Sequence, residues 1–253
     1  MHIETQGAGE PLLLIHGWGM HGGLWGEMAT QLAQSFTVHA VDLPGHGHSR
    51  EMGDAFTLDA VVSALSAQFD EPLTLCGWSL GGMLAQQWAL QQPQQVRRLI
   101  LLASTPCFAA REDWAHGMAT ETLAQFAGEL EQNFAATLRR FLALQVRGSE
   151  GERELLVALR ERLFSRGEPQ LAALRGGLDI LRDADLRSML PQIKQPVLAL
   201  AGERDKLTPP QASHYLAATV PQGQVVEIAG AAHAPFLSHR EQCVQALMNF
   251  MNC

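Results

Sequence analysis

The chain has 253 residues, 47% of them hydrophobic, which suffices for one large α/β domain or for a domain that carries an insert. Its net charge of −8 argues against non-specific nucleic-acid binding, and no stretch approaches the roughly 20 apolar residues that span a bilayer. Residues 1–15 lack the basic start of a signal peptide, and the four cysteines are scattered without a C-x-x-C pair, so we expect a cytoplasmic monomer without a disulfide framework.

Apolar runs recur along the chain with helical segments between them. Most read as near-continuous β-strands, a pattern typical of a parallel sheet that is buried on both faces. In such a sheet, the loops after the carboxyl ends of the strands meet at one edge and form the site. The predicted strands cover residues 11–17, 36–43, 73–78, 97–104, 196–202 and 224–230.

Two glycine-rich loops follow the first two of these strands. "LIHGWGM" places Trp18 between Gly17 and Gly19, which let the backbone approach a neighbouring loop closely. "VDLPGHGHS" at 41–49 resembles a phosphate-binding loop but lacks a following Gly-Lys-Ser, so a structural turn is the better interpretation. No further ligands accompany His46 and His48 at metal-binding spacing, and we therefore expect neither a metal nor a cofactor.

The third strand runs into "GWSLGG", where Ser79 stands at the point at which a strand changes to a helix. A tight turn that happens to contain serine is the simple interpretation. A strained strand–turn–helix elbow is the other, because Gly77 and Gly81 relieve the crowding around such a nucleophile. The helix that starts near Leu80 directs free N–H groups at the site, which suits an oxyanion. The context on both sides favours Ser79 as a nucleophile.

A long helical segment separates the fourth and fifth strands. Apolar side chains recur at three- and four-residue steps from Leu123 to Phe141, "RGSEG" at 147–151 interrupts the pattern, and a second helical run follows. This pattern predicts an all-helical insert. We expect residues 109–190 to form a cap and residues 1–108 and 191–253 to form the core.

The last two strands supply a candidate acid and a candidate base. Asp205 in "GERDKLTPP" follows the fifth strand, and His233 in "GAAHAPF" follows the sixth. A nucleophilic serine needs a general base, and the base needs an orienting carboxylate. The chain order Ser79, Asp205, His233 is that of the α/β-hydrolase fold, a mostly parallel sheet flanked by helices. The backbone N–H groups of Leu80 and Trp18 are the expected oxyanion donors.

Several stretches resemble one family within the α/β-hydrolase superfamily. "ASTPCFAAREDW", "RFLALQ", "GGLDIL" and "AAHAPFLSH" are similar to the pimeloyl-acyl-carrier-protein methyl ester esterases of bacterial biotin synthesis. The resemblance implies a serine carboxylesterase that hydrolyses the methyl ester at the distal end of a carrier-bound pimeloyl chain. It also implies that Trp18 and the segment Phe141, Leu142, Ala143, Leu144 and Gln145 bind the acyl substrate.

Arginines concentrate in the insert. Residues 139–166 hold seven arginines and four glutamates, and none of the seven has an acid four residues away, the usual spacing of helix ion pairs. A solvated face is one interpretation, and a surface for an acidic acyl-carrier protein with its phosphopantetheine is the other. The resemblance implies that Arg140 and Arg153 contact this carrier.

Two other functions stay open at this point. One is a carboxylesterase or carbon–carbon-bond hydrolase of the same fold that acts on a free small molecule. The other is a non-catalytic receptor that retains the triad. Dehalogenase and epoxide-hydrolase chemistry is disfavoured, because those relatives carry Asp where this chain has Ser79.

Overall fold

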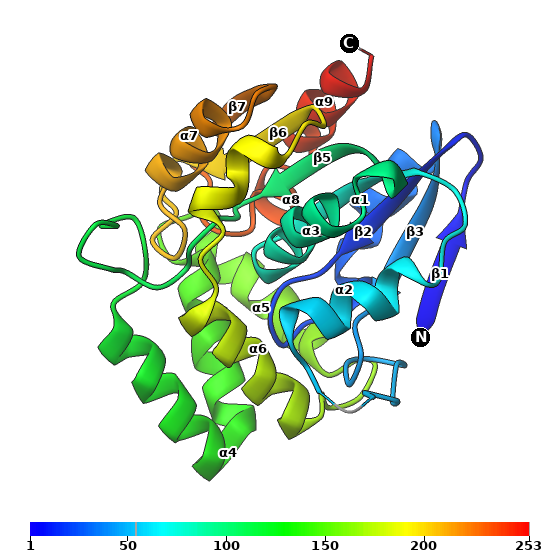
Figure 1. The fold of residues 1–253 in the computed structure, drawn as a ribbon. Coiled ribbons are helices and arrows are strands. Elements are labelled where there is room, and N and C mark those ends of the chain that lie inside the picture. The colour runs from blue at the N-terminus through cyan, green and yellow to red at the C-terminus, as the bar shows by residue number, and fades with distance from the viewer. Residues whose placement is uncertain (54, 253) are drawn as a thin grey trace.

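The computed structural model describes residues 1–53 and 55–252, which leaves Cys253 outside the described residues. Seven strands form one sheet in the order β1-β3-β2-β4-β5-β6-β7, and all neighbours are parallel except the antiparallel pair β1 and β3 (Figure 1). The strands are β1 (His2–Gln6), β2 (Glu10–Ile15), β3 (Phe36–Asp42), β4 (Leu73–Trp78), β5 (Val96–Leu102), β6 (Val197–Gly202) and β7 (Gly223–Ile228). The predicted mostly parallel sheet is confirmed.

The six predicted apolar runs correspond to β2 through β7, and β1 is the strand that the sequence analysis missed. The central strands β4 and β6 are buried along their whole length, which explains their near-continuous apolar sequences. The residues of β1 are half-buried or exposed, because this strand lies at the edge of the sheet. Its sequence "HIETQ" therefore has no apolar run to mark it.

Helices pack on the sheet and on one another. Helix α2 packs on α3, which packs on β4 and β5, while α1 packs on α9 and α7 packs on β6 and β7. The helices outside the predicted insert are α1 (Gly26–Leu32), α2 (Leu58–Ser66), α3 (Leu80–Gln91), α7 (Pro210–Thr219), α8 (Pro235–Ser238) and α9 (Arg240–Met251), with 3-10 turns η1 (Gly22–Trp25) and η2 (Pro93–Gln95). A third 3-10 turn, η3 (Arg187–Gln192), crosses the predicted end of the insert. No helix in the described part of the chain is both long and apolar enough to cross a membrane.

Three helices lie between β5 and β6 and group together beside the sheet (Figure 1). They are α4 (Thr120–Val146), α5 (Glu152–Leu163) and α6 (Leu171–Asp183). Helix α4 buries Leu123, Phe126, Leu130, Leu138 and Phe141, which is the apolar face expected from their spacing. A break at Asn133, with φ −157° and ψ 83°, divides α4 into two segments. The "RGSEG" stretch separates α4 from α5.

Candidate active site

Ser79, Asp205 and His233 come together at the carboxyl edge of the sheet. The Ser79 hydroxyl lies 2.9 Å from His233 Nε2, and His233 Nδ1 lies 2.8 Å from Asp205 Oδ2. Because a carboxylate only accepts, this arrangement puts the imidazole proton on Nδ1 and leaves Nε2 free to accept the serine proton. The exposed fractions are 5% for Ser79, 2% for Asp205 and 0% for His233, so bulk water does not compete with these contacts.

The loop after β6 fixes the side chain of Asp205 through three hydrogen bonds. Asp205 Oδ1 accepts the backbone N–H groups of Leu207 at 2.8 Å and Thr208 at 3.0 Å. The Thr208 hydroxyl donates to Asp205 Oδ2 at 2.8 Å and lies 3.2 Å from His233 Nδ1. Hydrogen bonds of this kind fix the carboxylate in the plane where it orients the imidazole. The sequence analysis missed Thr208, although it stands only three residues after Asp205.

Ser79 sits on a strained elbow between β4 and α3. It has φ 55° and ψ −116°, which a residue with a side chain rarely adopts. A Cβ at Gly77 would lie 2.3 Å from the carbonyl oxygen of Gly81, and a Cβ at Gly81 would lie 2.2 Å from that of Ile15. Both positions therefore require glycine. Ser104 Oγ donates to the Ser79 carbonyl at 2.8 Å and braces the turn.

The loop after β2 lies close to the elbow that carries Ser79. A Cβ at Gly17 would lie 3.4 Å from Ser79 Cβ, so the backbone that leads to Trp18 passes beside Ser79. Leu80 is the first residue of α3, where a backbone N–H has no acceptor within the helix. The indole of Trp18 is buried and donates to the Leu174 carbonyl in α6 at 2.9 Å. The sequence analysis did not predict this hydrogen bond between the loop after β2 and the insert.

Buried His16 fixes the start of this loop in a neutral form. Its Nδ1–H donates to the Gly17 carbonyl at 2.8 Å, and its Nε2 accepts the Leu43 N–H at 3.0 Å. Burial lowers the pKa of His16 to about 3, with a further contribution from nearby His46. Burial likewise lowers the pKa of His46 to about 4. Both imidazoles are therefore uncharged in the folded protein at neutral pH.

This burial predicts acid-labile folding. The unfolded chain protonates both histidines near pH 6.5, whereas the folded chain does not, so stability falls as pH drops from about 6.5 toward 4. Two such groups give a slope of about 2.7 kcal/mol per pH unit in that window. We expect urea unfolding of His46→Gln to show a shallower slope, while exposed His214→Gln keeps the parent slope. A constant free energy of unfolding between pH 7 and 5 would contradict the prediction.

The proposed acyl-binding segment forms the last turns of α4. Phe141, Leu142 and Gln145 are buried, and Ala143 and Leu144 are half-buried. The Phe141 ring packs edge-on against Trp18 with 4.9 Å between ring centroids. The Gln145 carbonyl accepts the His233 backbone N–H at 3.0 Å, so α4 contacts both the loop that carries Trp18 and the loop that carries His233.

A cavity of about 940 Å³ lies between the two ends of α4 and the loop that carries Asp205. Leu144, Leu207 and Met118 give it an apolar lining. Three cations and one acid, Glu203, line it as well, and we call Arg147, Arg204 and Lys206 the cationic rim. Arg204 donates to the Gly148 carbonyl at 3.2 Å and lies 3.9 Å from Glu203. Among the described residues, Arg147 and Lys206 have no acidic partner.

The insert arginines differ in their partners. Arg140 pairs with Glu129 and lies over the Phe126 ring, 5.0 Å from its centroid. This acid stands eleven residues away, so a search at four-residue spacing does not find it. Arg166 pairs with Glu4 and buried Asp42. Arg153 is exposed and has no ion pair with any residue that the structure describes.

His48 lies in a group that its sequence neighbours do not reveal. Nitrogen or oxygen atoms of His2, Asp42 and His48 lie within 4.8 Å of one another, which corrects the expectation that no further ligands accompany His48. The two histidines stand 46 positions apart in the sequence, and strand β1 brings them together. The Asp42 oxygens accept the N–H groups of Gly22 and His48 and the Arg166 guanidinium, so donors already occupy this carboxylate.

Comparison with known proteins places this geometry in a family context. The family model described as alpha/beta hydrolase fold matches residues 10–240. A pimeloyl-[acyl-carrier protein] methyl ester esterase of Stenotrophomonas maltophilia is 46% identical over 251 residues, covering 99% of this chain and 96% of that protein. The protein of the same name from Nitrosomonas europaea is 43% identical, covering 96% of each chain.

Solved structures share the fold at lower identity. An esterase from Exiguobacterium antarcticum superposes with a TM-score of 0.91 at 22% identity, covering 100% of this chain and 95% of that one. A bromoperoxidase from Bacillus anthracis has a TM-score of 0.90 at 20% identity, covering 99% and 95%. The differing names show that this architecture hosts more than one chemistry, so these two structures support the fold alone.

Proposed function

This chain belongs to the alpha/beta hydrolase fold family and to the pimeloyl-[acyl-carrier protein] methyl ester esterases within it, and we propose that it hydrolyses the methyl ester of pimeloyl-acyl-carrier protein. It is a carboxylic ester hydrolase. The reaction frees the distal carboxylate of the pimeloyl chain for biotin synthesis and leaves the thioester to the carrier intact. The observation that carries the proposal is the hydrogen-bonded series Ser79, His233 and Asp205 in a family of named esterases.

In the proposed mechanism, Ser79 attacks the ester carbonyl carbon while His233 Nε2 takes the hydroxyl proton. The carbonyl oxygen becomes an oxyanion, which accepts the N–H groups of Leu80 and Trp18. Each such donor is worth about 3 kcal/mol in the transition state. The bond from the carbonyl carbon to the methoxy oxygen then breaks, and His233 protonates the departing methoxide to methanol. Water, deprotonated by His233, cleaves the acyl-Ser79 ester, and Asp205 stabilises the imidazolium in both steps.

The cap supplies the acyl-binding surface in this proposal. Residues 109–190 cover the sheet edge, and the segment from Phe141 to Gln145 lines the path of the chain beside Trp18. The apolar lining of the adjoining cavity suits the methylene groups of the substrate, and its cationic rim suits an anionic carrier. Arg153 on α5, which has no ion pair among the described residues, adds a further positive charge, whereas Arg140 on α4 is paired with Glu129.

Kinetics on two methyl esters test the proposal against an esterase for free small molecules. We expect kcat/KM for the carrier-bound methyl pimeloyl ester to exceed that for dimethyl pimelate by at least about a hundredfold, because the carrier adds binding surface. Equal values for both esters would favour the free-ester alternative. Inactivity toward every ester would favour a receptor.

Carrier contact predicts a specific dependence on salt. We expect Arg153→Glu, alone or with Arg140→Glu, to lower kcat/KM for the carrier-bound ester about tenfold at low salt and to flatten its decline with added salt. The single variant Arg153→Glu is needed because Arg140→Glu also breaks the ion pair with Glu129, and that loss affects the insert itself. Dimethyl pimelate should be hydrolysed at the parent rate.

Arg97→Glu is the matched control for this charge change. Arg97 lies near the start of β5, at the opposite end of the strand from the site, and its partner is Glu10 at 3.6 Å. It should leave both substrates unaffected. An equal loss on both substrates in Arg153→Glu would instead mean that the arginine supports the cap, and the carrier contact would be refuted.

We also propose that the enzyme acts in the cytoplasm as a monomer. Cys76, Cys107 and Cys243 are free and buried, as expected in a reducing compartment. Light scattering of the purified protein tests the oligomeric state, and a mass near 27.6 kDa is expected.

A further inference from the structure

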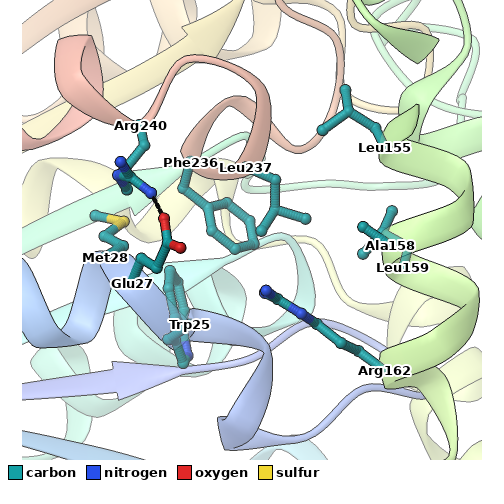
Figure 2. Close-up of a pocket in the computed structure, with 10 residues that line it drawn as sticks. All are labelled: Trp25, Glu27, Met28, Leu155, Ala158, Leu159, Arg162, Phe236, Leu237 and Arg240. Atoms are coloured by element: carbon teal, nitrogen blue, oxygen red, sulfur yellow. Dashed lines mark ion pairs between the residues drawn. The ribbon is translucent and has the colours of Figure 1, made fainter. Parts of the chain in front are cut away.

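A small pocket lies between α5 and the core (Figure 2). It shares no lining residue with the large cavity, and no residue of the triad lines it. Its volume is about 120 Å³, well above the ~10–15 Å³ that one water molecule needs. Three parts of the chain far apart in sequence enclose it: η1 with α1, helix α5, and α8 with α9. The lining residues are Trp25, Glu27, Met28, Leu155, Ala158, Leu159, Arg162, Phe236, Leu237 and Arg240.

The inner wall of the pocket is apolar and almost fully buried. The rings of Trp25 and Phe236 pack with 4.7 Å between their centroids, and Met28 and Leu159 complete this surface. Such a wall favours a hydrocarbon group over water. The pocket has room for a ligand of only a few non-hydrogen atoms.

Arg162 supplies positive charge to this pocket. Trp25 Nε1 has no hydrogen-bond partner among the described residues, but it has almost no accessible surface, so the ring of Trp25 and not its N–H faces the pocket. Arg162 reaches from α5 toward Trp25 (Figure 2), and its one hydrogen bond is long, 3.5 Å to the Leu24 carbonyl. No described acid pairs with Arg162, because Glu27, the only acid lining the pocket, is paired with Arg240. The Arg162 guanidinium is therefore available to a charged acceptor that enters the pocket.

From this geometry we infer that the pocket is a binding site for a short alkyl carboxylate, of the size of propionate or butyrate. Its carboxylate accepts from the Arg162 guanidinium, and a pairing of a guanidinium with a carboxylate is stronger than a neutral hydrogen bond. Its alkyl group packs against Met28, Leu159 and Phe236. This site is independent of the proposed esterase reaction and of the acyl-binding segment.

A ligand here joins the cap to the loop that carries His233. Arg162 and Leu159 belong to α5, whereas Trp25 and Phe236 belong to the core. Phe236 also packs against Trp78 with 5.0 Å between ring centroids, and Trp78 Nε1 donates to the His233 carbonyl at 2.8 Å. Occupancy therefore stabilises the folded protein by mass action and braces the contact between α5 and the histidine loop.

Indole N–H signals in an NMR spectrum locate the binding directly. The chain has five tryptophans, and the signal absent from Trp25→Phe belongs to Trp25. We expect sodium butyrate to shift this signal saturably, with sodium chloride at equal ionic strength as the reference. A signal that does not move with butyrate, or that moves equally with chloride, would overturn the assignment to a carboxylate site.

Two arginine variants on α5 provide a second test of butyrate binding. Arg162→Met removes the guanidinium and keeps an apolar side chain, and we expect at least a tenfold loss of butyrate affinity by calorimetry. Arg160→Met is the matched control, because Arg160 is exposed on α5 and does not line the pocket. Butyrate binding that survives Arg162→Met at parent affinity belongs to another site, such as the esterase centre, and refutes the inference. If Arg162→Met does not fold, the Trp25 signal in the parent protein decides alone.

Discussion

Replacing Ser79 with alanine is expected to lower kcat for ester hydrolysis by about 10⁴- to 10⁶-fold. His233→Ala should cost nearly as much, and the double variant should cost little more than either single one. Ser79 and His233 lie 2.9 Å apart and are proposed to act as one catalytic unit. Once either side chain is absent, the other no longer contributes to catalysis, so its removal lowers kcat little further. Single-turnover kinetics on the carrier-bound methyl ester measures all three variants on one scale.

Thermal unfolding of the same variants serves as the control. The two single variants should unfold within a few degrees of the parent, because neither removes an apolar core side chain. Near-multiplicative losses in the double variant would mean that Ser79 and His233 contribute independently. The assignment of one catalytic unit would then be wrong.

Gly81→Ala is expected to reduce kcat/KM at least about a hundredfold, a loss comparable with that of one oxyanion donor. The added Cβ would lie 2.2 Å from the Ile15 carbonyl oxygen and 2.7 Å from that of His16. These are backbone atoms, so either the elbow or the loop that leads to Trp18 must move. Stability should fall as well, by about 1–3 kcal/mol, since the site is fully packed.

Gly128→Ala is the matched control for this substitution. Gly128 lies on the exposed side of α4, and an added Cβ there meets no atom within 4 Å. It should raise the free energy of unfolding by about 0.5–1 kcal/mol and leave kcat/KM unchanged. Parent-like activity in folded Gly81→Ala would refute the idea that the close approach of the two loops builds the oxyanion site.

Much of the core was predictable because its signals are local. The apolar runs of β2 to β7 reflect burial on both faces, and the glycines of the elbow reflect a φ of 55° at Ser79. The edge strand β1 carries no such run, since solvent covers part of it. Asp205 and His233 were recognisable from their positions after strands, because a parallel sheet gathers those positions at one edge.

The supporting contacts of the site were not predictable, because they join residues far apart in sequence. The indole of Trp18 contacts Leu174 in α6, and the His233 N–H contacts Gln145 in α4. Spacing along one helix also gave an incomplete account of Arg140, whose acid Glu129 lies beyond the break at Asn133. Such pairs depend on how the insert folds back on itself and on the core.

Mass spectrometry of the carrier before and after incubation tests the central claim most directly. The substrate is methyl-pimeloyl carrier protein, treated with the parent enzyme and, in parallel, with Ser79→Ala. We predict that the parent enzyme removes the mass of one CH₂ unit while the pimeloyl group stays on the carrier, and that Ser79→Ala leaves the mass unchanged over the same period. Release of free carrier by thioester cleavage, an unchanged mass with the parent enzyme, or equal conversion by Ser79→Ala would contradict the account.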